Sequence, residues 1–309
     1  MQMPPWPRQN RRMKPTAPLR PITDDEVATF WRDGVVCLRQ VLPQALLESM
    51  AGPLEDALGG AAVTNLSTMG DDLERHAGAV RLVDENVRAA PVPRGHFKAG
   101  TDHWCDQPEF LAFATRSPLG PIVSRLLGSA QVRLYEDSVL VKEPGTHEKT
   151  AFHQDMAYFH LAGELVCTTW VPLDSVRAES GAVRFVVGSH RDRTRYKPNM
   201  FVTTMTLPDT IGAEVPDYDD DQPEQIGRAR IVNFDTEPGD ITVHHARTIH
   251  GAYANASATQ RRRAISVRYA GDGTTFVPVA GGFPKPHHAH LHVGDPLDDR
   301  ASPLAWPRD

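Results

Sequence analysis

The stretch FHQDMAYFH, residues 152–160, lies near the middle of the chain and holds two histidines, an aspartate and three aromatic residues. In a β-strand, residues i and i+2 point to the same face, so His153 and Asp155 are predicted to lie side by side. Two side chains alone cannot hold a catalytic metal. The stretch therefore predicts either half of a metal site or an ordinary strand with a surface aspartate, and a third ligand decides between them.

The segment GDITVHHARTIHGAYANASATQRRRAISVRY, residues 239–269, offers the candidates for that third ligand. His250 comes where a predicted strand ends, and with His153 and Asp155 it gives two imidazoles and one carboxylate. That set is the facial triad of non-haem Fe(II) oxygenases, which leaves coordination positions open. We expect His244 and His245 to be core histidines or neighbours of the ligands, with His245 as an alternative ligand.

Three consecutive arginines, residues 261–263, begin the next predicted strand. A guanidinium can bind a carboxylate through two parallel hydrogen bonds. The distal end of 2-oxoglutarate needs such a partner while its keto-acid end chelates iron. This arginine run therefore indicates a 2-oxoglutarate site beside the metal.

From residue 130 the chain is rich in short predicted strands separated by turns such as Glu143-Pro144-Gly145. Many short strands with frequent turns predict a sandwich or barrel, and among these folds the jelly roll commonly holds a metal site in its open mouth. The expected fold is mainly β with flanking helices and a double-stranded β-helix (jelly-roll) core. Strands are predicted at residues 132–135, 138–141, 168–171, 183–187, 241–245 and 264–269.

The region before residue 130 is predicted to be largely helical. Thr23 and Glu26 have the spacing of a capping box, which predicts a helix that ends near Gly34. A short strand is expected at residues 35–38. Further helices are predicted at residues 43–58, which Pro53 either kinks or splits, and at residues 109–127, with a break at Ser117-Pro118. Residues 61–100 have no clear pattern.

The predicted organisation is a flexible N-terminal tail, residues 1–20, and a single domain, residues 21–309. Within the domain we expect helices over 21–128, the jelly-roll core over about 130–275 and a C-terminal extension over 276–309. Residues 191–236 form a long insertion of the kind that often makes a lid, although its acidic patch, residues 217–221, fits a solvated loop equally well. The histidine cluster at residues 287–292 indicates a solvent-exposed tract.

Composition excludes several classes of protein. The 309-residue chain has a net charge of -6, which does not indicate a nucleic-acid partner, and it has no apolar run long enough to cross a membrane. Its three cysteines are scattered, which fits a reducing cytoplasm better than a disulfide framework or a zinc finger. The expected partner is a small-molecule substrate in the cytoplasm, and the sequence does not fix the oligomeric state.

In combination, these motifs resemble those of the phytanoyl-CoA dioxygenase family of Fe(II)- and 2-oxoglutarate-dependent oxygenases. The resemblance runs from about residue 22 to about residue 270. It rests on the order and spacing of short matches: Asp33-Gly34-Val35-Val36, the His153–Asp155 motif, Thr169-Trp170-Val171-Pro172-Leu173-Asp174, Glu179-Ser180-Gly181, Gly188-Ser189-His190, Gly239-Asp240, His250-Gly251, Asn255 and Ser257.

The resemblance implies a jelly roll with N-terminal helices outside it, and iron held by His153, Asp155 and His250. Fe(II), 2-oxoglutarate and O₂ are the implied cofactor and cosubstrates. Arg261 matches the position of the family's 2-oxoglutarate arginine, and Arg263, on the same strand face, is the second choice. Trp170 is expected to line the cosubstrate pocket. Lys142, which precedes the His153 strand, is expected either to reach the cosubstrate or a substrate anion or to be a solvated lysine.

The sequence also departs from the family. Relatives often have an apolar and proline-containing stretch after this motif, whereas here Met156-Ala157-Tyr158-Phe159-His160 follow. Tyr158, Phe159 and His160 are therefore predicted to contact the substrate. Halogenating relatives replace the carboxylate that Asp155 retains.

The resemblance thus implies a dioxygenase that hydroxylates, or desaturates, an unactivated C–H of a small molecule and releases succinate and CO₂. The alternatives are a non-catalytic jelly-roll binding protein and a cupin-type metalloenzyme that uses zinc or manganese without 2-oxoglutarate.

Overall fold

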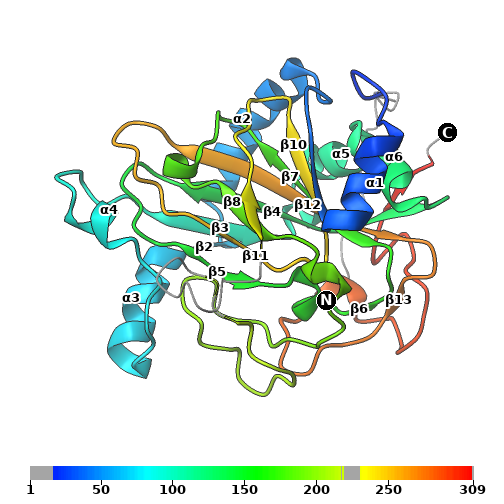
Figure 1. Ribbon diagram of the computed structural model, residues 1–309. Helices are drawn as coiled ribbons and strands as arrows, with labels where there is room; N and C mark the ends of the chain where they lie inside the picture. Colours follow the sequence, from blue (N-terminus) through cyan, green and yellow to red (C-terminus); the bar gives the residue numbers. More distant parts are fainter. Residues whose placement is uncertain (1–16, 217, 219–229, 308–309) are drawn as a thin grey trace.

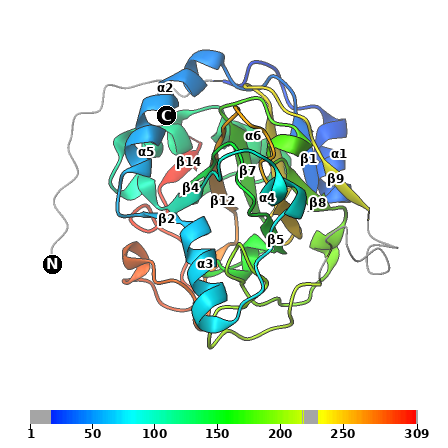
Figure 2. The same cartoon turned by 90° about the vertical axis from the view of Figure 1, so that its left-hand side faces the viewer.

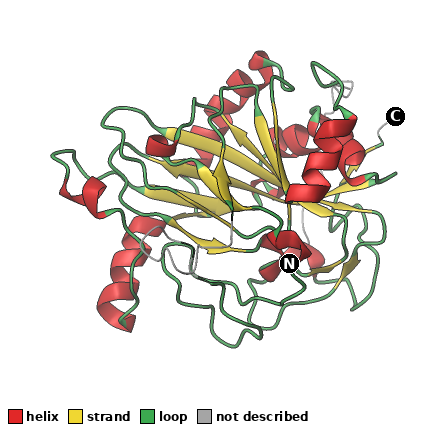
Figure 3. Ribbon diagram, viewed as in Figure 1, coloured by secondary structure: helices red, strands yellow, loops and turns green. Residues whose placement is uncertain are grey.

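The computed structural model describes residues 17–216, 218 and 230–307. Two antiparallel sheets face each other, and helices lie against the outer face of the larger one (Figures 1 and 3). The prediction of a mainly β, jelly-roll fold is confirmed, although the sheets remain open at their edges. Most of the predicted tail and all of the acidic patch except Tyr218 lie outside the described residues.

The larger sheet has the strand order β1-β10-β7-β12-β4-β3-β2, and β14 pairs with β4 beside it. The two segments expected at 132–135 and 138–141 form one continuous strand, which pairs along most of its length with β12. The bounds are β1 Val35–Leu38, β10 Ile241–His245, β7 Val166–Pro172, β12 Arg262–Gly271, β4 Val132–Lys142, β3 Phe97–Thr101, β2 Val63–Asn65 and β14 Leu304–Trp306.

The smaller sheet has the order β5-β11-β8-β9, with bounds β5 Thr150–His153, β11 His250–Ala252, β8 Val183–Val186 and β9 Ile231–Asn233. Strand β9 lies inside the predicted insertion at 191–236, so the end of that insertion is part of the core rather than a lid. A separate two-stranded ribbon joins β13 (Thr275–Phe276) to β6 (Leu161–Ala162), as Figure 1 shows.

Four helices cover the larger sheet: α1 Asp24–Asp33, α2 Gln44–Leu58, α5 Pro108–Arg116 and α6 Leu119–Leu127. The capping box of Thr23 and Glu26 is present, and the chain breaks between α5 and α6 at Ser117-Pro118 as expected. Pro53 stays within an unbroken α2. Helix α3 (Leu66–Ala77) lies apart from these four, beside β2 and β3 (Figure 2), and α4 is Glu85–Ala89.

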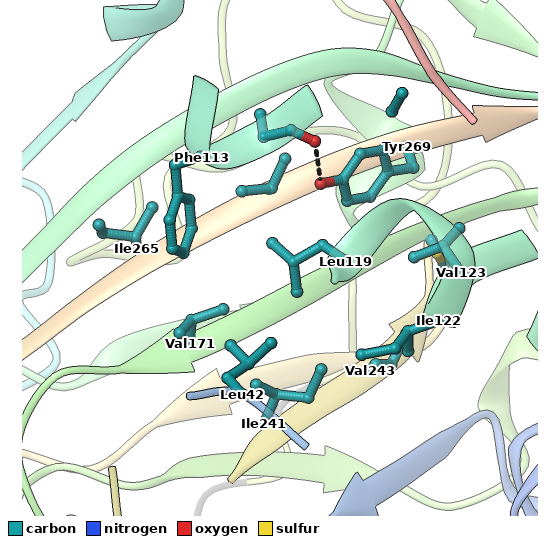
Figure 4. Close-up of a cluster of buried hydrophobic side chains, with 14 of the residues drawn as sticks. Leu42, Phe113, Leu119, Ile122, Val123, Val171, Ile241, Val243, Ile265 and Tyr269 are labelled. Carbon is teal, nitrogen blue, oxygen red and sulfur yellow. Dashed lines mark hydrogen bonds between the residues drawn. The ribbon is translucent and has the colours of Figure 1, made fainter. Parts of the chain in front are cut away.

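Alternation along β12 separates a core face from a site face. Ile265, Val267 and Tyr269 belong to the main apolar core beneath the helices, and the Tyr269 hydroxyl donates to the Ala114 carbonyl of α5 at 2.7 Å (Figure 4). Their neighbours Ser266 and Arg268 point into the space between the two sheets, where both line a cavity. The helices thus anchor one face of the sheet and leave the other for a binding site.

No helix in the described ranges is long and apolar enough to span a bilayer.

Candidate metal centre

His153 and His250 lie directly opposite each other on neighbouring antiparallel strands. His153 is the last residue of β5 and His250 is the first of β11, and their ring centroids are 4.3 Å apart. Asp155 follows at the start of a short 3-10 turn, η2 (Asp155–Ala157). The prediction that His153 and Asp155 share one strand is therefore wrong, because β5 ends at His153 and Asp155 lies in the turn that follows.

The turn nevertheless brings the carboxylate back between the two imidazoles. Oδ1 of Asp155 lies 3.7 Å from Nε2 of His153 and 3.7 Å from Nε2 of His250. The three donor atoms all lie within 4.8 Å of one another, and all three side chains are buried. Two imidazoles and one carboxylate in this arrangement are typical of Fe(II) binding, so the donor set fits the expected metal.

Backbone carbonyls fix the protonation of both imidazole rings. Nδ1 of His153 lies 2.8 Å from the Ala151 carbonyl, and Nδ1 of His250 lies 3.0 Å from the Thr248 carbonyl. A carbonyl oxygen only accepts, so each Nδ1 carries the proton and each Nε2 offers its lone pair toward Asp155. Burial, with nearby histidines, holds the pKa of His250 well below its usual value, which favours the neutral ring that a metal requires.

The second oxygen of Asp155 is already occupied. The Thr168 hydroxyl donates to Oδ2, and Nε2 of His244 lies 3.3 Å from the same oxygen. Burial raises the pKa of Asp155, but His250, His153 and His244 outweigh that effect and hold it well below the usual range. The carboxylate is therefore ionised, with Oδ1 directed at the two ligand nitrogens.

His245 points away from this centre. Its Nε2 lies 2.8 Å from the Glu164 carbonyl, and its Nδ1 accepts a hydrogen bond from the Arg247 backbone N–H at 3.1 Å. Both ring nitrogens are used, so His245 is not placed as an alternative ligand. His244, whose role the sequence left open, is the histidine that supports Asp155.

A narrow cavity continues from the three donors into the space between the sheets, and Trp170 and Arg262 line it. The side chain of Arg262 is fully buried, its guanidinium lies 5.8 Å from the Trp170 ring centre, and it donates to the Leu140 carbonyl at 3.2 Å. Burial lowers the pKa of Arg262 to about 10, although Asp174 opposes the shift. Within the described part of the chain no acidic side chain pairs with Arg262, so this buried cation has no counter-ion of its own.

The structure corrects the two arginine predictions. Arg261 pairs with Glu55 at 2.7 Å and with Glu143 at 3.0 Å, outside the cavity. Arg263 pairs with Asp174 at 2.6 Å on the same side of β12. The arginine that lines the cavity is Arg262, and a sequence signal for its direction exists: Arg261 and Arg263 alternate in phase with Ile265 and Val267, the large apolar residues of the core face.

Lys142 does not reach the cavity or solvent either. It is buried opposite Arg262 on β4, and its ammonium donates to the Glu148 carbonyl at 2.9 Å and the Tyr253 carbonyl at 2.5 Å. Burial, together with Arg262, lowers its pKa well below the usual value. Lys142 therefore ties together the backbone behind the cavity. Trp170, by contrast, lies in the cavity wall, and its expected role beside the cosubstrate stays a prediction.

The three residues predicted to contact substrate divide into two groups. Tyr158 and Phe159 line a second, larger cleft of about 450 Å³ that also reaches Asp155. His160 is outside the lining of that cleft, because its ring nitrogens bind the backbone of Val279 and Phe283 at 2.8 and 2.7 Å. His160 therefore does not face this cleft, unlike Tyr158 and Phe159.

The C-terminal histidine cluster is not simply a solvent-exposed tract. His287 and His288 lie in a buried 3-10 turn, η5 (Pro286–His288). The ring of His287 packs on Trp104 at 5.1 Å, and that of His288 packs on Tyr135 at 5.5 Å. These aromatic contacts explain why His287 and His288 are buried, which the sequence pattern did not indicate.

The model of the phytanoyl-CoA dioxygenase family matches residues 30–264, well over half of the chain. The chain belongs to this family. The match covers all three metal-binding candidates and Arg262, and it ends before the C-terminal extension.

Solved structures share the fold with this family member. SnoK, described as a non-heme alpha ketoglutarate dependent carbocyclase from nogalamycin biosynthesis, is 23% identical, with a TM-score of 0.62 over 92% of this chain and 96% of that one. The epimerase SnoN, solved with Fe3+, alpha ketoglutarate and nogalamycin RO, is 24% identical, with a TM-score of 0.63 over 91% and 97%. EctD from S. alaskensis, solved with bound Fe, is 17% identical, with a TM-score of 0.57 over 86% and 82%.

Proposed function

We propose that this protein is an Fe(II)- and 2-oxoglutarate-dependent dioxygenase that hydroxylates an unactivated C–H of a small molecule and releases succinate and CO₂. The observation that carries the proposal is one shared cavity. It joins the donor group of His153, Asp155 and His250 to the unpaired, buried guanidinium of Arg262.

The three donors would hold Fe(II) from one side. The fixed rings of His153 and His250 offer Nε2, and Asp155 offers Oδ1 while Thr168 and His244 bind its other oxygen. This arrangement favours one oxygen donor from Asp155 and leaves positions free for cosubstrates. Bound Fe(II) would supply the chemistry that lets O₂, the oxidant, oxidise both 2-oxoglutarate, to succinate and CO₂, and the substrate C–H.

Arg262 would bind the distal carboxylate of 2-oxoglutarate. A carboxylate in this dry site would replace the counter-ion that Arg262 lacks, and the planar guanidinium suits two parallel hydrogen bonds. Trp170 and Phe97, whose ring centres lie 5.8 and 5.9 Å from the guanidinium, restrict water around it. The cosubstrate would therefore be oriented at both ends.

The larger cleft is the proposed substrate site because it meets the inner cavity at Asp155, Phe201 and Arg268. Hydroxylation is the proposed outcome because Asp155 keeps the carboxylate that halogenating relatives lack. Fold relatives are described as a carbocyclase and an epimerase, so the product itself distinguishes these outcomes.

The first test is spectroscopic. Anaerobic addition of Fe(II) and 2-oxoglutarate should give a weak visible charge-transfer band, and His153→Ala or Asp155→Ala should abolish it. A full-strength band in both variants would contradict the proposed metal centre. Substrate-stimulated succinate release, with a product heavier by one oxygen atom, would establish hydroxylation, whereas a product with two fewer hydrogens would indicate desaturation.

A further inference from the structure

The larger cleft has a predominantly apolar lining close to the metal centre. Its apolar side chains include Leu66, Met69, Phe159, Met200, Phe201 and Phe283. A volume of about 450 Å³ falls within the usual range for sites that bury a drug-sized molecule. The cleft therefore suits a compact, largely apolar ligand.

Part of the cleft wall comes from the C-terminal extension. We call residues 277–285 the strap; it follows β13 (orange in Figure 1) and lies beyond the residues that match the family model. It contributes Phe283, Pro284 and Lys285 to the lining. Phe283 is 62% exposed, so a large aromatic ring stands at the cleft without a protein partner that covers it.

His160, at the end of the stretch 152–160, holds the strap in place. The Val277 N–H donates to the His160 carbonyl at 3.0 Å, and the Val279 N–H donates to its Nδ1 at 2.8 Å. Nε2 of His160 then donates to the Phe283 carbonyl at 2.7 Å. His160 is thus a positioning residue, since it sets where Phe283 stands relative to the cleft.

Lys285 fixes the other end of the strap inside a balanced ionic group. Its ammonium lies 2.8 Å from Asp102 and 2.7 Å from Glu136, and Arg268 lies 3.3 Å from Glu136. Two cations thus face two carboxylates. Among the described residues that line the cleft, each basic side chain already has an acidic partner, so the lining offers no free cation for a phosphate.

We propose that the strap is a substrate-selecting wall, and that the cleft takes an uncharged or cationic, largely apolar molecule rather than a polyanionic CoA thioester. This assignment rests on the proposed function in taking the cleft as the substrate site. It goes against the substrate that the family's name suggests, because the lining holds three carboxylates against two cations and most of its surface is apolar. The charged residues are Asp102, Glu136, Asp155, Arg268 and Lys285.

The test uses two fluorescent probes that differ by one negative group, N-phenyl-1-naphthylamine and its sulfonated analogue 8-anilinonaphthalene-1-sulfonate. With the full chain, the uncharged probe should bind at least about 10-fold more tightly than the anionic one, because the carboxylates of the lining disfavour the sulfonate. Palmitoyl-CoA should not displace the uncharged probe. Tighter binding of the anionic probe, or displacement by palmitoyl-CoA, would overturn the assignment.

Matched variants locate the bound probe. Phe283→Ala should lower the affinity for the uncharged probe by about 5-fold, because it removes apolar contact area from the wall. Val293→Ala, at another exposed apolar residue of the extension, should leave binding unchanged. Asp102→Asn should raise the affinity for the anionic probe about 3-fold, because it removes one negative charge. Asparagine tolerates the left-handed backbone of Asp102, which has φ 60°. Equal effects of Phe283→Ala and Val293→Ala, or no effect of Asp102→Asn, would contradict the proposal.

Probe binding needs neither Fe(II) nor 2-oxoglutarate. Absence of the charge-transfer band with intact probe selectivity would therefore reject the proposed function alone, whereas a normal band with preference for the anionic probe would reject the assignment of the cleft alone.

Discussion

Arg261 and Arg262 are adjacent in sequence, yet their guanidinium groups lie on opposite faces of β12. Arg262 enters the cavity beside Trp170, whereas Arg261 pairs with Glu55 and Glu143 outside it. Neighbouring residues of a strand point to opposite faces, so the buried, unpaired Arg262 stands next in sequence to the half-buried, paired Arg261. The two arginines thus form a matched pair for testing the 2-oxoglutarate site.

Arg262→Leu should weaken 2-oxoglutarate binding by about 100-fold, because a charge-assisted pair in a buried site is worth several kcal/mol. Arg261→Leu should change the dissociation constant by less than about 2-fold, since it removes only surface ion pairs. Anaerobic titration of the charge-transfer band measures both. Comparable losses in the two variants would show that Arg262 has no special role.

Thr168 and Thr169 offer a similar comparison at the metal. Thr168→Val removes the hydroxyl that donates to Asp155 and should lower Fe(II) affinity by about 10-fold, as is usual for partners of metal ligands. Thr169 instead donates to the Val267 carbonyl at 3.1 Å, so Thr169→Val should leave Fe(II) affinity unchanged. Metal titration under anaerobic conditions decides; an unchanged affinity in Thr168→Val would refute the supporting role of Thr168.

Buried neutral histidines should make the fold sensitive to acid. Burial lowers the pKa of His245 and His287 to about 4 and that of His288 to about 3. Because these values lie below the ordinary value of about 6.5, the unfolded chain binds more protons between about pH 6.5 and pH 4. The free energy of unfolding is therefore at its full value above about pH 6.5. It falls as the pH drops toward 4, by about 1.4 kcal/mol per pH unit for each such histidine.

His288→Phe tests this relation, because phenylalanine keeps an aromatic ring against Tyr135 and Phe276 but cannot titrate. In the variant, the slope of the free energy of unfolding against pH below about 6.5 should correspond to about one proton fewer. Urea unfolding at several pH values between 5 and 7 gives the slope. An identical slope in both proteins would rule out His288 as a contributor.

Gly34 occupies a position where only glycine fits. Its φ is 80°, and an added Cβ would lie 2.4 Å from Nδ1 of His190 and 2.7 Å from the Thr248 hydroxyl. Gly34→Ala should lower the free energy of unfolding by about 2 kcal/mol or more. Gly52→Ala, in α2 where an added Cβ meets nothing within 4 Å beyond its chain neighbours, should change it by less than about 1 kcal/mol, because the gain in helix propensity is opposed by Pro53 next to it. The denaturant midpoint of Gly34→Ala should therefore lie clearly below that of Gly52→Ala.

The sequence predicted the metal-binding candidates because their signals are local and chemically specific. His153 and Asp155 are two residues apart, and the turn after β5 still directs both side chains to one point. The position of His250 opposite His153 depends on strand pairing over almost a hundred residues, and it followed from the ligand chemistry rather than from any local pattern.

The prediction placed Arg261 in the cavity because it matched a family position, and such a match can be wrong by one residue. Strand alternation separates Arg261 from Arg262, because neighbouring residues point to opposite faces. The role of His160 was hidden for another reason, since its partners Val279 and Phe283 are backbone groups more than a hundred residues away. Helix α3 was missed because residues 61–100 gave no clear pattern, although Asn65 caps this helix and Gly78 ends it. The prediction of a single domain over 21–309 stays a prediction, as does a cytoplasmic location.

The strap and the metal-binding candidates lie in separate parts of the sequence, which matters for engineering. All metal-binding candidates precede residue 251, whereas the strap follows residue 276 and is held by His160 at one end and by the ion pairs of Lys285 with Asp102 and Glu136 at the other. A graft that replaces residues 272–309 with the corresponding segment of another relative needs a single junction, after β12, and must supply a β14 that still pairs with β4. Such chimeras would exchange one wall of the cleft and leave the metal-binding candidates in place.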